Sequence, residues 1–302
     1  MDMLFINYLI MRKYLLHVLI ISFVFFITPT ILAASDVERK IEELKQTIRI
    51  NPDDADAHAN LGAAYADSGI YKESIESCKQ AIRINPDHIN AHYNLGVAYV
   101  KSDMHKEAIE AFKQAIRINP DHINAHYNLG SAYSKSGKYK EATEAFKQAI
   151  RINSDDADAH NNLGHAYSKS GKYKEATEAF KQAIRINPDK AEFHYFLGHA
   201  YANLGMYKEA IAAFKQAIRI NPAKAEFHYF LGSAYSKSGK YKEATEAFKQ
   251  AIRIDPDHIN AYYNLGLVYN LSNDKNSALD QCEILKSLDP EMANKLFNII
   301  YE

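Results

Sequence analysis

Two pairs of histidines have a spacing that could bind a metal ion. His88 and His92 are four residues apart, the separation at which two side chains on one helix can chelate zinc. His122 and His126 repeat this spacing. The first histidine of each pair is expected to lie in a turn, however, and no acidic general base accompanies either pair. The sequence also contains no Gly-rich phosphate loop, Ser-His-Asp set or paired-cysteine motif. We therefore expect no catalytic centre, metal site, cofactor or small-molecule substrate.

Asparagines recur beside a Leu-Gly-x-x-Tyr motif. They precede the leucine in five of its seven copies, phenylalanine replaces them in the other two, and a tyrosine usually stands one residue further back. Because an amide carries both a donor and an acceptor, a row of asparagines can hydrogen-bond an extended main chain whatever its sequence. The alternative is that these asparagines merely pack or face solvent. The predicted peptide-binding groove comprises Asn60, Asn94, Asn128, Asn162, Asn264, Tyr93, Tyr127, Tyr195, Phe196, Tyr229 and Phe230.

Glycine and proline mark a 34-residue period along the chain. Seven glycines, from Gly62 to Gly266, recur once in every period, and five more follow one of those after seven residues. Seven prolines, from Pro52 to Pro290, keep the same period, with Ser154 at the one position where proline is missing. A fixed period of this size indicates stacked repeats, whose usual product is a binding surface rather than a reaction centre.

Each repeat is predicted to be a pair of helices joined by a tight turn. In the third repeat His126, Leu129, Gly130 and Tyr133 stand at i, i+3, i+4 and i+7, which defines one face of a helix. Gly137 then supplies the left-handed conformation that ends this helix, and a second apolar stripe follows. In two repeats the turn glycine is replaced by residues that tolerate the same backbone, Asp103 and Asn273. The aspartates after the proline positions are expected to cap the next helix: Asp87, Asp121, Asp155, Asp189 and Asp257.

The Leu-Gly-x-x-Tyr motif, followed by Ala, Phe, Ala and Pro at fixed offsets, resembles the tetratricopeptide repeat (TPR). The third repeat shows it from Leu129 to Tyr133, with Ala142, Phe146 and Ala149 after it. A half repeat at 35–54 precedes seven full repeats, and a terminal helix covers 291–302. The full repeats are 55–88, 89–122, 123–156, 157–190, 191–224, 225–258 and 259–292.

The resemblance implies an all-α fold, a TPR α-solenoid in which helix–turn–helix units form a right-handed superhelix. Its concave face, lined by the first helix of each unit, should hold an extended peptide or a partner helix. Members of this family are scaffolds far more often than catalysts. The chain is therefore not expected to be an enzyme.

Two features known within the TPR family narrow the expected partner. The asparagine row resembles the asparagine ladder in the TPR superhelix of the O-linked N-acetylglucosamine transferase, which grips substrate peptides. The lysines and arginines of the carboxylate clamp that binds acidic chaperone tails are absent, so such tails are disfavoured. At those positions stand Asp56, Asn90, Asn124, Asp158, Glu192, Glu226 and Asn260. Phe196 and Phe230 make the fifth and sixth repeats the most apolar part of the groove, where we expect partner side chains to insert.

Residues 1–34 have the pattern of a secretory signal peptide. Arg12 and Lys13 precede the apolar run 14–27, and Pro29 and small residues follow it. Cleavage is expected after Ala34. The repeats are then periplasmic or secreted.

An uncleaved signal anchor is the competing interpretation. Residues 14–34 are long enough to span a bilayer, and Met11 is an alternative to Met1 as the true start. The basic residues before the apolar run should stay in the cytoplasm, so the repeats lie outside the cytoplasm in both cases. An anchored protein would sit in the inner membrane and contact it only through residues 11–34.

Charge and cysteine content argue against other classes of protein. Without residues 1–34 the chain has 34 basic and 36 acidic residues, a formal charge of −2, so nucleic-acid binding is not expected. Cys78 and Cys282 lie six periods apart, at a position where other repeats have phenylalanine. We expect both to be buried apolar residues, because six stacked repeats separate them by more than a disulfide can span.

The function that follows is a protein–protein interaction scaffold outside the cytoplasm. It would hold an extended segment or helix of a partner protein, for example during assembly of an envelope or secretion complex. The alternative is a membrane-tethered structural array that self-associates end to end. Residues 130–152 and 232–254 are identical, which makes repeat faces interchangeable.

Overall fold

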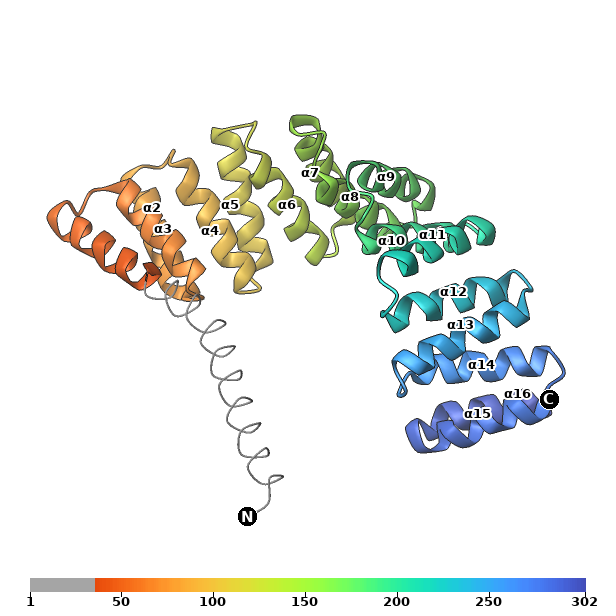
Figure 1. The fold of residues 1–302 in the computed structure, drawn as a ribbon. Helices are drawn as coiled ribbons and strands as arrows, with labels where there is room; N and C mark the ends of the chain where they lie inside the picture. The colour runs from red at the N-terminus through yellow and green to blue at the C-terminus, as the bar shows by residue number, and fades with distance from the viewer. Residues whose placement is uncertain (1–35) are drawn as a thin grey trace, which may run out of the picture. The chain divides into compact units, whose positions relative to one another are not determined.

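The computed structural model describes residues 36–302, which form helices connected by short turns (Figure 1). The predicted signal peptide or signal anchor at residues 1–34 lies outside the described residues. A helix at residues 36–50 precedes the helix pairs, and α16 (Pro290–Tyr301) follows them. None of the helices within residues 36–302 is both long and apolar enough to cross a membrane.

The helices alternate between a first and a second member of each pair, as the 34-residue period predicts. The first helices are α2 (Ala55–Asp67), α4 (Ile89–Lys101), α6 (Ile123–Lys135), α8 (Ala157–Lys169), α10 (Ala191–Asn203), α12 (Ala225–Lys237) and α14 (Ile259–Leu271). The second helices are α3 (Tyr71–Ile84), α5 (His105–Ile118), α7 (Tyr139–Ile152), α9 (Tyr173–Ile186), α11 (Tyr207–Ile220), α13 (Tyr241–Ile254) and α15 (Lys275–Leu288).

The chain divides into two compact units, the first ending at Ala132 and the second running from Tyr133 to Glu302. Within each unit the two helices of a pair pack against each other, and the second helix packs against the first helix of the next pair. This arrangement confirms the all-α fold of stacked helix–turn–helix units.

The turn inside each pair depends on one residue with positive φ. The φ angles of Gly137 and Gly171 are +73° and +72°, and Asp103 and Asn273 adopt 57° and 59° at the equivalent position. After the turn, the backbone N–H of Lys138 donates to the carbonyl of Tyr133 at 2.9 Å, which closes the end of the first helix. The prediction that glycine, aspartate and asparagine share this turn is confirmed.

Close contact between the two helices of a pair requires a second glycine. A Cβ atom on Gly96 would lie 2.5 Å from the ring of Phe112, so only glycine lets α4 approach α5 this closely. Phe112 is fully buried, and phenylalanines at the same repeat position are buried to a similar degree. Cys78 takes this position in α3, where burial raises the pKa of its thiol to about 12. Cys78 and Cys282 are free and buried, as expected.

The expected helix caps are wrong by one residue. The side chain of Asn85 accepts a hydrogen bond from the backbone N–H of Asp87 at 3.1 Å, which forms a local turn and moves the cap to His88. The Nδ1 atom of His88 then accepts from the N–H of Ala91 at 3.2 Å. The predicted caps Asp87, Asp121, Asp155, Asp189 and Asp257 therefore lie in the turns before the helices.

The same contacts give the histidine pairs a structural role. While Nδ1 of His88 caps α4, the Nε2 atom of His92 hydrogen-bonds the carbonyl of Pro86 at 2.8 Å. His122 and His126 make the equivalent contacts. Through these hydrogen bonds the histidine rings connect each turn to the helix that follows it.

Candidate functional site

The predicted groove residues lie on the first helices, and several of them connect consecutive repeats. Nδ2 of Asn128 donates to the hydroxyl of Tyr93 in the preceding repeat at 3.0 Å. In the second unit, Nδ2 of Asn264 donates to the hydroxyl of Tyr229 at 2.9 Å. Each asparagine thus uses one of its two N–H donors across a repeat junction.

Asn94 makes a third junction contact, because Nδ2 donates to the backbone carbonyl of Ala59 at 3.3 Å. Asn60 is exposed on α2, whereas Asn94, Asn128, Asn162, Asn264, Tyr93, Tyr127 and Tyr229 are half-buried. Asn94, Asn128 and Asn264 each keep the carbonyl oxygen, an acceptor for peptide N–H groups, and one of the two N–H donors. The other N–H of each amide holds two repeats together.

Aromatic rings form a continuous cluster in the second unit, around the two phenylalanines that replace asparagine. Phe196 stacks on Phe180 with ring centroids 6.0 Å apart, and Phe230 stacks on Phe214 at 6.2 Å. Both Phe196 and Phe230 are half-buried, so part of each ring remains available at the surface of the first helices. This cluster is the most apolar part of the predicted groove.

Two histidines that the sequence did not single out complete the aromatic cluster. His165 lies edge-on to Phe196 with ring centroids 4.0 Å apart, and His199 lies edge-on to Phe230 at 4.1 Å. The sequence contains one pattern that could have revealed these contacts. In both pairs the histidine directly follows the glycine of one Leu-Gly-x-x-Tyr motif, and the phenylalanine directly precedes the leucine of the next motif. Where serine follows the glycine, at Ser131 and Ser233, the next repeat has asparagine.

Burial changes the protonation of these histidines. It is the main cause that lowers the pKa of His165 to about 4, and the charges of Lys169 and His199 add to it. Burial also lowers the pKa of His199, against a smaller opposite effect of Glu226. Nε2 of His199 is buried without a hydrogen-bond partner among the described residues. Both rings are therefore neutral at pH 7, which suits their packing against phenyl rings.

Tyr195 lies deeper than the groove prediction implies. Only 8% of its surface is exposed, and its hydroxyl donates a 2.5 Å hydrogen bond to the carboxylate of Glu226 in the next repeat. Burial is the main cause that raises the pKa of Tyr195, and the hydrogen bond and the charge of Glu226 act in the same direction. Tyr195 thus positions Glu226 and supports Phe196 and Phe230, rather than presenting its own surface.

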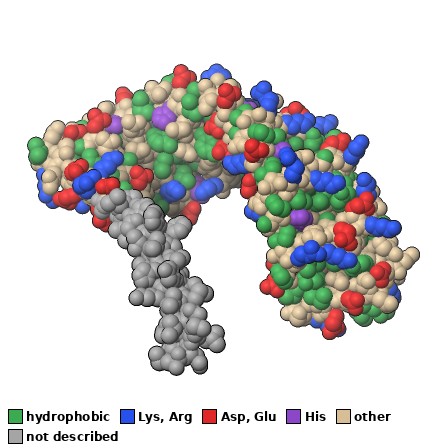
Figure 2. Space-filling model, viewed as in Figure 1, with side chains coloured by type: hydrophobic (Ala, Val, Ile, Leu, Met, Phe, Trp, Pro, Cys, Tyr) green, Lys and Arg blue, Asp and Glu red, His purple; other side chains and the backbone are tan. Residues whose placement is uncertain are grey.

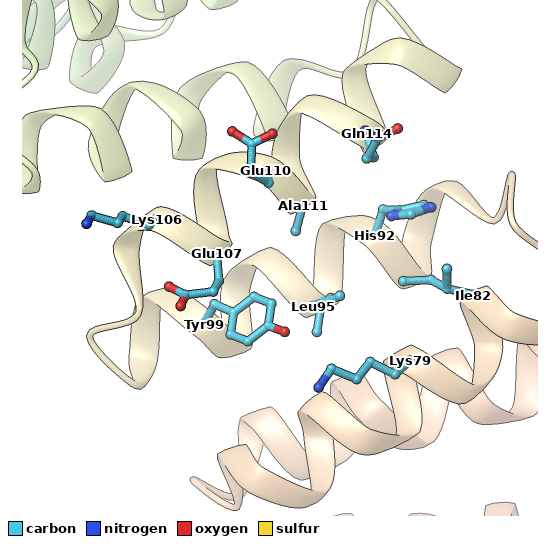
Figure 3. Close-up of a pocket in the computed structure, with 10 residues that line it drawn as sticks. All are labelled: Lys79, Ile82, His92, Leu95, Tyr99, Lys106, Glu107, Glu110, Ala111 and Gln114. Atoms are coloured by element: carbon cyan, nitrogen blue, oxygen red, sulfur yellow. The ribbon is translucent and has the colours of Figure 1, made fainter.

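Two cavities lie away from the predicted groove residues, one in each unit. One of about 530 Å³ lies among α3, α4 and α5, with Ile82, Leu95 and Ala111 among its apolar residues and Lys106 and Glu110 among its charged ones (Figure 3). A second, of about 400 Å³, has the same residue types at the same repeat positions four periods later. Because the cavity recurs with the repeat, we interpret it as a product of helix-pair geometry. Charged side chains of both signs also surround apolar ones on the visible surface (Figure 2).

Stacked helix pairs, whose first helices present side chains at a surface within each unit, define a protein-interaction scaffold. The chain belongs to the tetratricopeptide repeat family. A family model described as "Cilia and flagella-associated protein 70 C-terminal domain" matches residues 94–289, and a "TPR repeat" model matches residues 38–69 and 64–103. No curated protein sequence matches the chain.

Solved structures agree with this assignment. The chain is similar to YrrB, described as a TPR protein with an unusual peptide-binding site, with a TM-score of 0.55 and 26% identity over 62% of this chain and 96% of YrrB. It is also similar to the MamA protein, with a TM-score of 0.54 and 27% identity over 57% of this chain and 94% of MamA. A TPR repeat-containing protein from Cytophaga hutchinsonii shares the fold, with a TM-score of 0.65 and 16% identity over 78% of this chain and 97% of that one.

Proposed function

We propose that this protein binds an extended segment of a partner protein along its first helices, with the aromatic cluster as the main anchor. The observation that carries the proposal is the pair of half-buried phenylalanines, Phe196 and Phe230, held in place by His165, His199 and Tyr195. Apolar side chains of a partner would cover the exposed part of both rings, the type of contact that dominates binding energy at interfaces. The peptide-binding site in the description of YrrB supports the same class of ligand.

The asparagine row gives the proposal its second element. The amides of Asn94, Asn128 and Asn264 are fixed by their own junction contacts, so their carbonyl oxygens are already oriented before a ligand arrives. Preorganised acceptors bind backbone N–H groups with little loss of side-chain entropy. We propose that the oxygen of Asn264, which lies in the same unit as Phe196 and Phe230, holds the main chain of the partner while the phenylalanines hold its side chains.

We also propose that this binding takes place outside the cytoplasm, during assembly of an envelope or secretion complex. The support is the order of basic, apolar and small residues in residues 11–34. Mass spectrometry of the mature N-terminus tests the location. A start at Ser35 in an extracytoplasmic fraction agrees with a cleaved signal, whereas recovery of the intact chain from the cytoplasm contradicts both forms of the proposal.

The experiment that tests the binding face is selection of peptides from a random display library against the full chain. A photo-crosslinking residue at Ser233, on the first-helix face, should label the selected peptides. The same residue at Gln250, which lines the second cavity, is the matched control and should not. Labelling from Gln250 alone would place the peptide in the recurring cavity and overturn the proposal, as would failure to select any peptide.

End-to-end self-association is the second candidate, because several apolar side chains are exposed near α16. Leu271, Phe297 and Tyr301 are 58%, 45% and 57% exposed, and the rings of Phe297 and Tyr301 contact each other at 4.6 Å. If these residues bind another copy, sedimentation velocity should show a mass that rises with concentration, and serine at all three positions should abolish the increase. A monomer at every concentration rules this candidate out.

A further inference from the structure

We propose that one edge of the second unit binds an anionic membrane surface. The edge consists of the turns that join the first and second helices of four consecutive pairs. These turns comprise residues 135–141, 169–175, 203–209 and 237–243. They contain ten lysines and four glutamates, whereas the stretches at the opposite ends of the pairs contain six basic and eight acidic residues. The opposite stretches comprise residues 151–158, 185–192, 219–226 and 253–260. Positive charge is thus concentrated on one edge, although the whole chain has a formal charge of −1.

The topology of the unit places these turns side by side. His165 of α8 contacts Phe196 of α10, and His199 of α10 contacts Phe230 of α12, in each case a residue three repeat positions earlier, so these first helices stack in parallel and within about one turn of register. The second helices α9, α11 and α13 each pack back along their first helix after a turn of three residues. The turn at 135–141 lies beside the turn at 169–175, because residues of both line one cavity. All four turns therefore lie in one row.

The lysines of this row form no ion pair within the described part of the chain. All ten are exposed. Lysines on the helix shafts behave differently, because Lys147, Lys181 and Lys249 each pair with a glutamate three residues earlier, at 2.9, 2.7 and 3.7 Å. The charge of the row therefore remains available to an external partner.

Local helix energetics do not explain the lysines at the tips of the turns. Lys138, Lys172 and Lys240 occupy the N-cap of the second helices and make no capping hydrogen bond there. A cation at a helix N-terminus is also disfavoured by the helix dipole. Asp274 shows the favoured choice at the same position, since its side chain accepts from the N–H of Ser277 at 3.1 Å. Three of the four turns therefore lack a side-chain capping hydrogen bond and carry an exposed positive charge at the N-cap instead.

An apolar side chain in the row favours a membrane over an acidic polypeptide. Met206 takes the N-cap position of the third turn, between Lys172 and Lys240, and is 40% exposed. Surfaces that lie on membranes combine lysines, which meet anionic headgroups, with apolar side chains that enter the interface. An acidic polypeptide would satisfy the lysines and leave Met206 in water. The proposed ligand is therefore the headgroup layer of an anionic bilayer, which leaves the first-helix groove open for a peptide.

The test measures partition of the full chain into vesicles of phosphatidylcholine alone and of phosphatidylcholine with about one third phosphatidylglycerol. The apolar residues 14–27 contribute equally to partition into both vesicle types. The readout is therefore the ratio of the two partition coefficients, from which this contribution cancels. The variant Lys138→Asp/Lys172→Asp/Lys240→Asp should lose most of the preference for anionic vesicles. Each lysine contributes roughly fivefold near such a surface, so the expected loss is about 100-fold or more. Because aspartate caps helices, this variant should be at least as stable as the wild type, and the loss cannot be attributed to unfolding.

A matched control reverses the charge of three exposed arginines near the opposite edge. Arg151→Glu/Arg185→Glu/Arg253→Glu has the same change in formal charge and should keep a preference for anionic vesicles at least tenfold greater than that of the lysine variant. Equal losses in both variants would indicate a response to net charge alone and overturn the proposal. Equal partition of the wild type into both vesicle types would do the same. Binding to soluble poly-glutamate without a preference for anionic vesicles would assign the edge to an acidic protein instead.

Discussion

Acidification should destabilise the aromatic cluster, because His165 is buried in its neutral form. Its pKa in the folded protein is lowered from 6.5 to about 4. The unfolded chain therefore takes up a proton first, and the folded state loses stability as the pH falls from about 6.5 to about 4. Each unit of pKa difference corresponds to about 1.4 kcal/mol, so the free energy of unfolding should fall by about 3 kcal/mol over the whole pH range. Of this loss, about 2 kcal/mol should occur between pH 7 and pH 5.

The assay compares urea unfolding of the full chain at pH 7 and at about pH 5 for the wild type and His165→Gln. Glutamine at this position does not titrate, so the variant should lose about 2 kcal/mol less than the wild type between the two pH values. His228→Gln is a matched control on α12, where the Nε2 atom of His228 contacts the carbonyl of Pro222 at 2.9 Å outside the cluster. The free energy of unfolding of His228→Gln should change with pH as that of the wild type does.

An NMR titration of the His165 imidazole checks the same reasoning directly. The ring should stay neutral at pH 5.5, about one unit below the ordinary histidine pKa. A ring that titrates near pH 6.5, together with equal pH dependence of the wild type and His165→Gln, would refute the burial argument.

Three substitutions test the packing of individual repeats, each by urea unfolding of the full chain at pH 7. Gly96→Ala should destabilise by about 1–3 kcal/mol, because its Cβ atom would overlap the ring of Phe112; no measurable loss would mean that α4 and α5 are further apart. Phe248→Ala should cost about 3–5 kcal/mol, since the ring is fully buried; a loss below about 1 kcal/mol would contradict that burial. Tyr229→Phe should cost about 1 kcal/mol, because Nδ2 of Asn264 loses its acceptor, whereas an unchanged stability would show that this junction contact contributes nothing.

The period of glycines and prolines was enough to predict helix pairs, their turns and their family. The φ angles of Asp103 and Asn273 show why, since the turn requires a backbone conformation that few residues tolerate. The caps were misplaced by one residue because Asn85 forms its own turn with the backbone, a competition that the Asn-Pro-Asp sequence alone does not decide.

The groove was harder to predict because its chemistry depends on contacts between repeats. The types of Asn128 and Asn264 predicted amide groups on the first helices, but only the structure shows that their donors bind Tyr93 and Tyr229. The role of His165 likewise depends on a ring in the next repeat. Such pairings are set by the register of neighbouring helices rather than by local periodicity.

The most direct test of the central claim is the affinity of a library-selected peptide for Phe196→Asn/Phe230→Asn, measured by calorimetry. Asparagine is the residue that the other repeats have at this position, so the variant keeps the repeat pattern and removes only the aromatic anchor. Loss of two interface aromatics should weaken binding by about 30-fold or more. An affinity within about twofold of the wild type, with folding intact, would contradict the claim that the aromatic cluster on the first helices holds the partner.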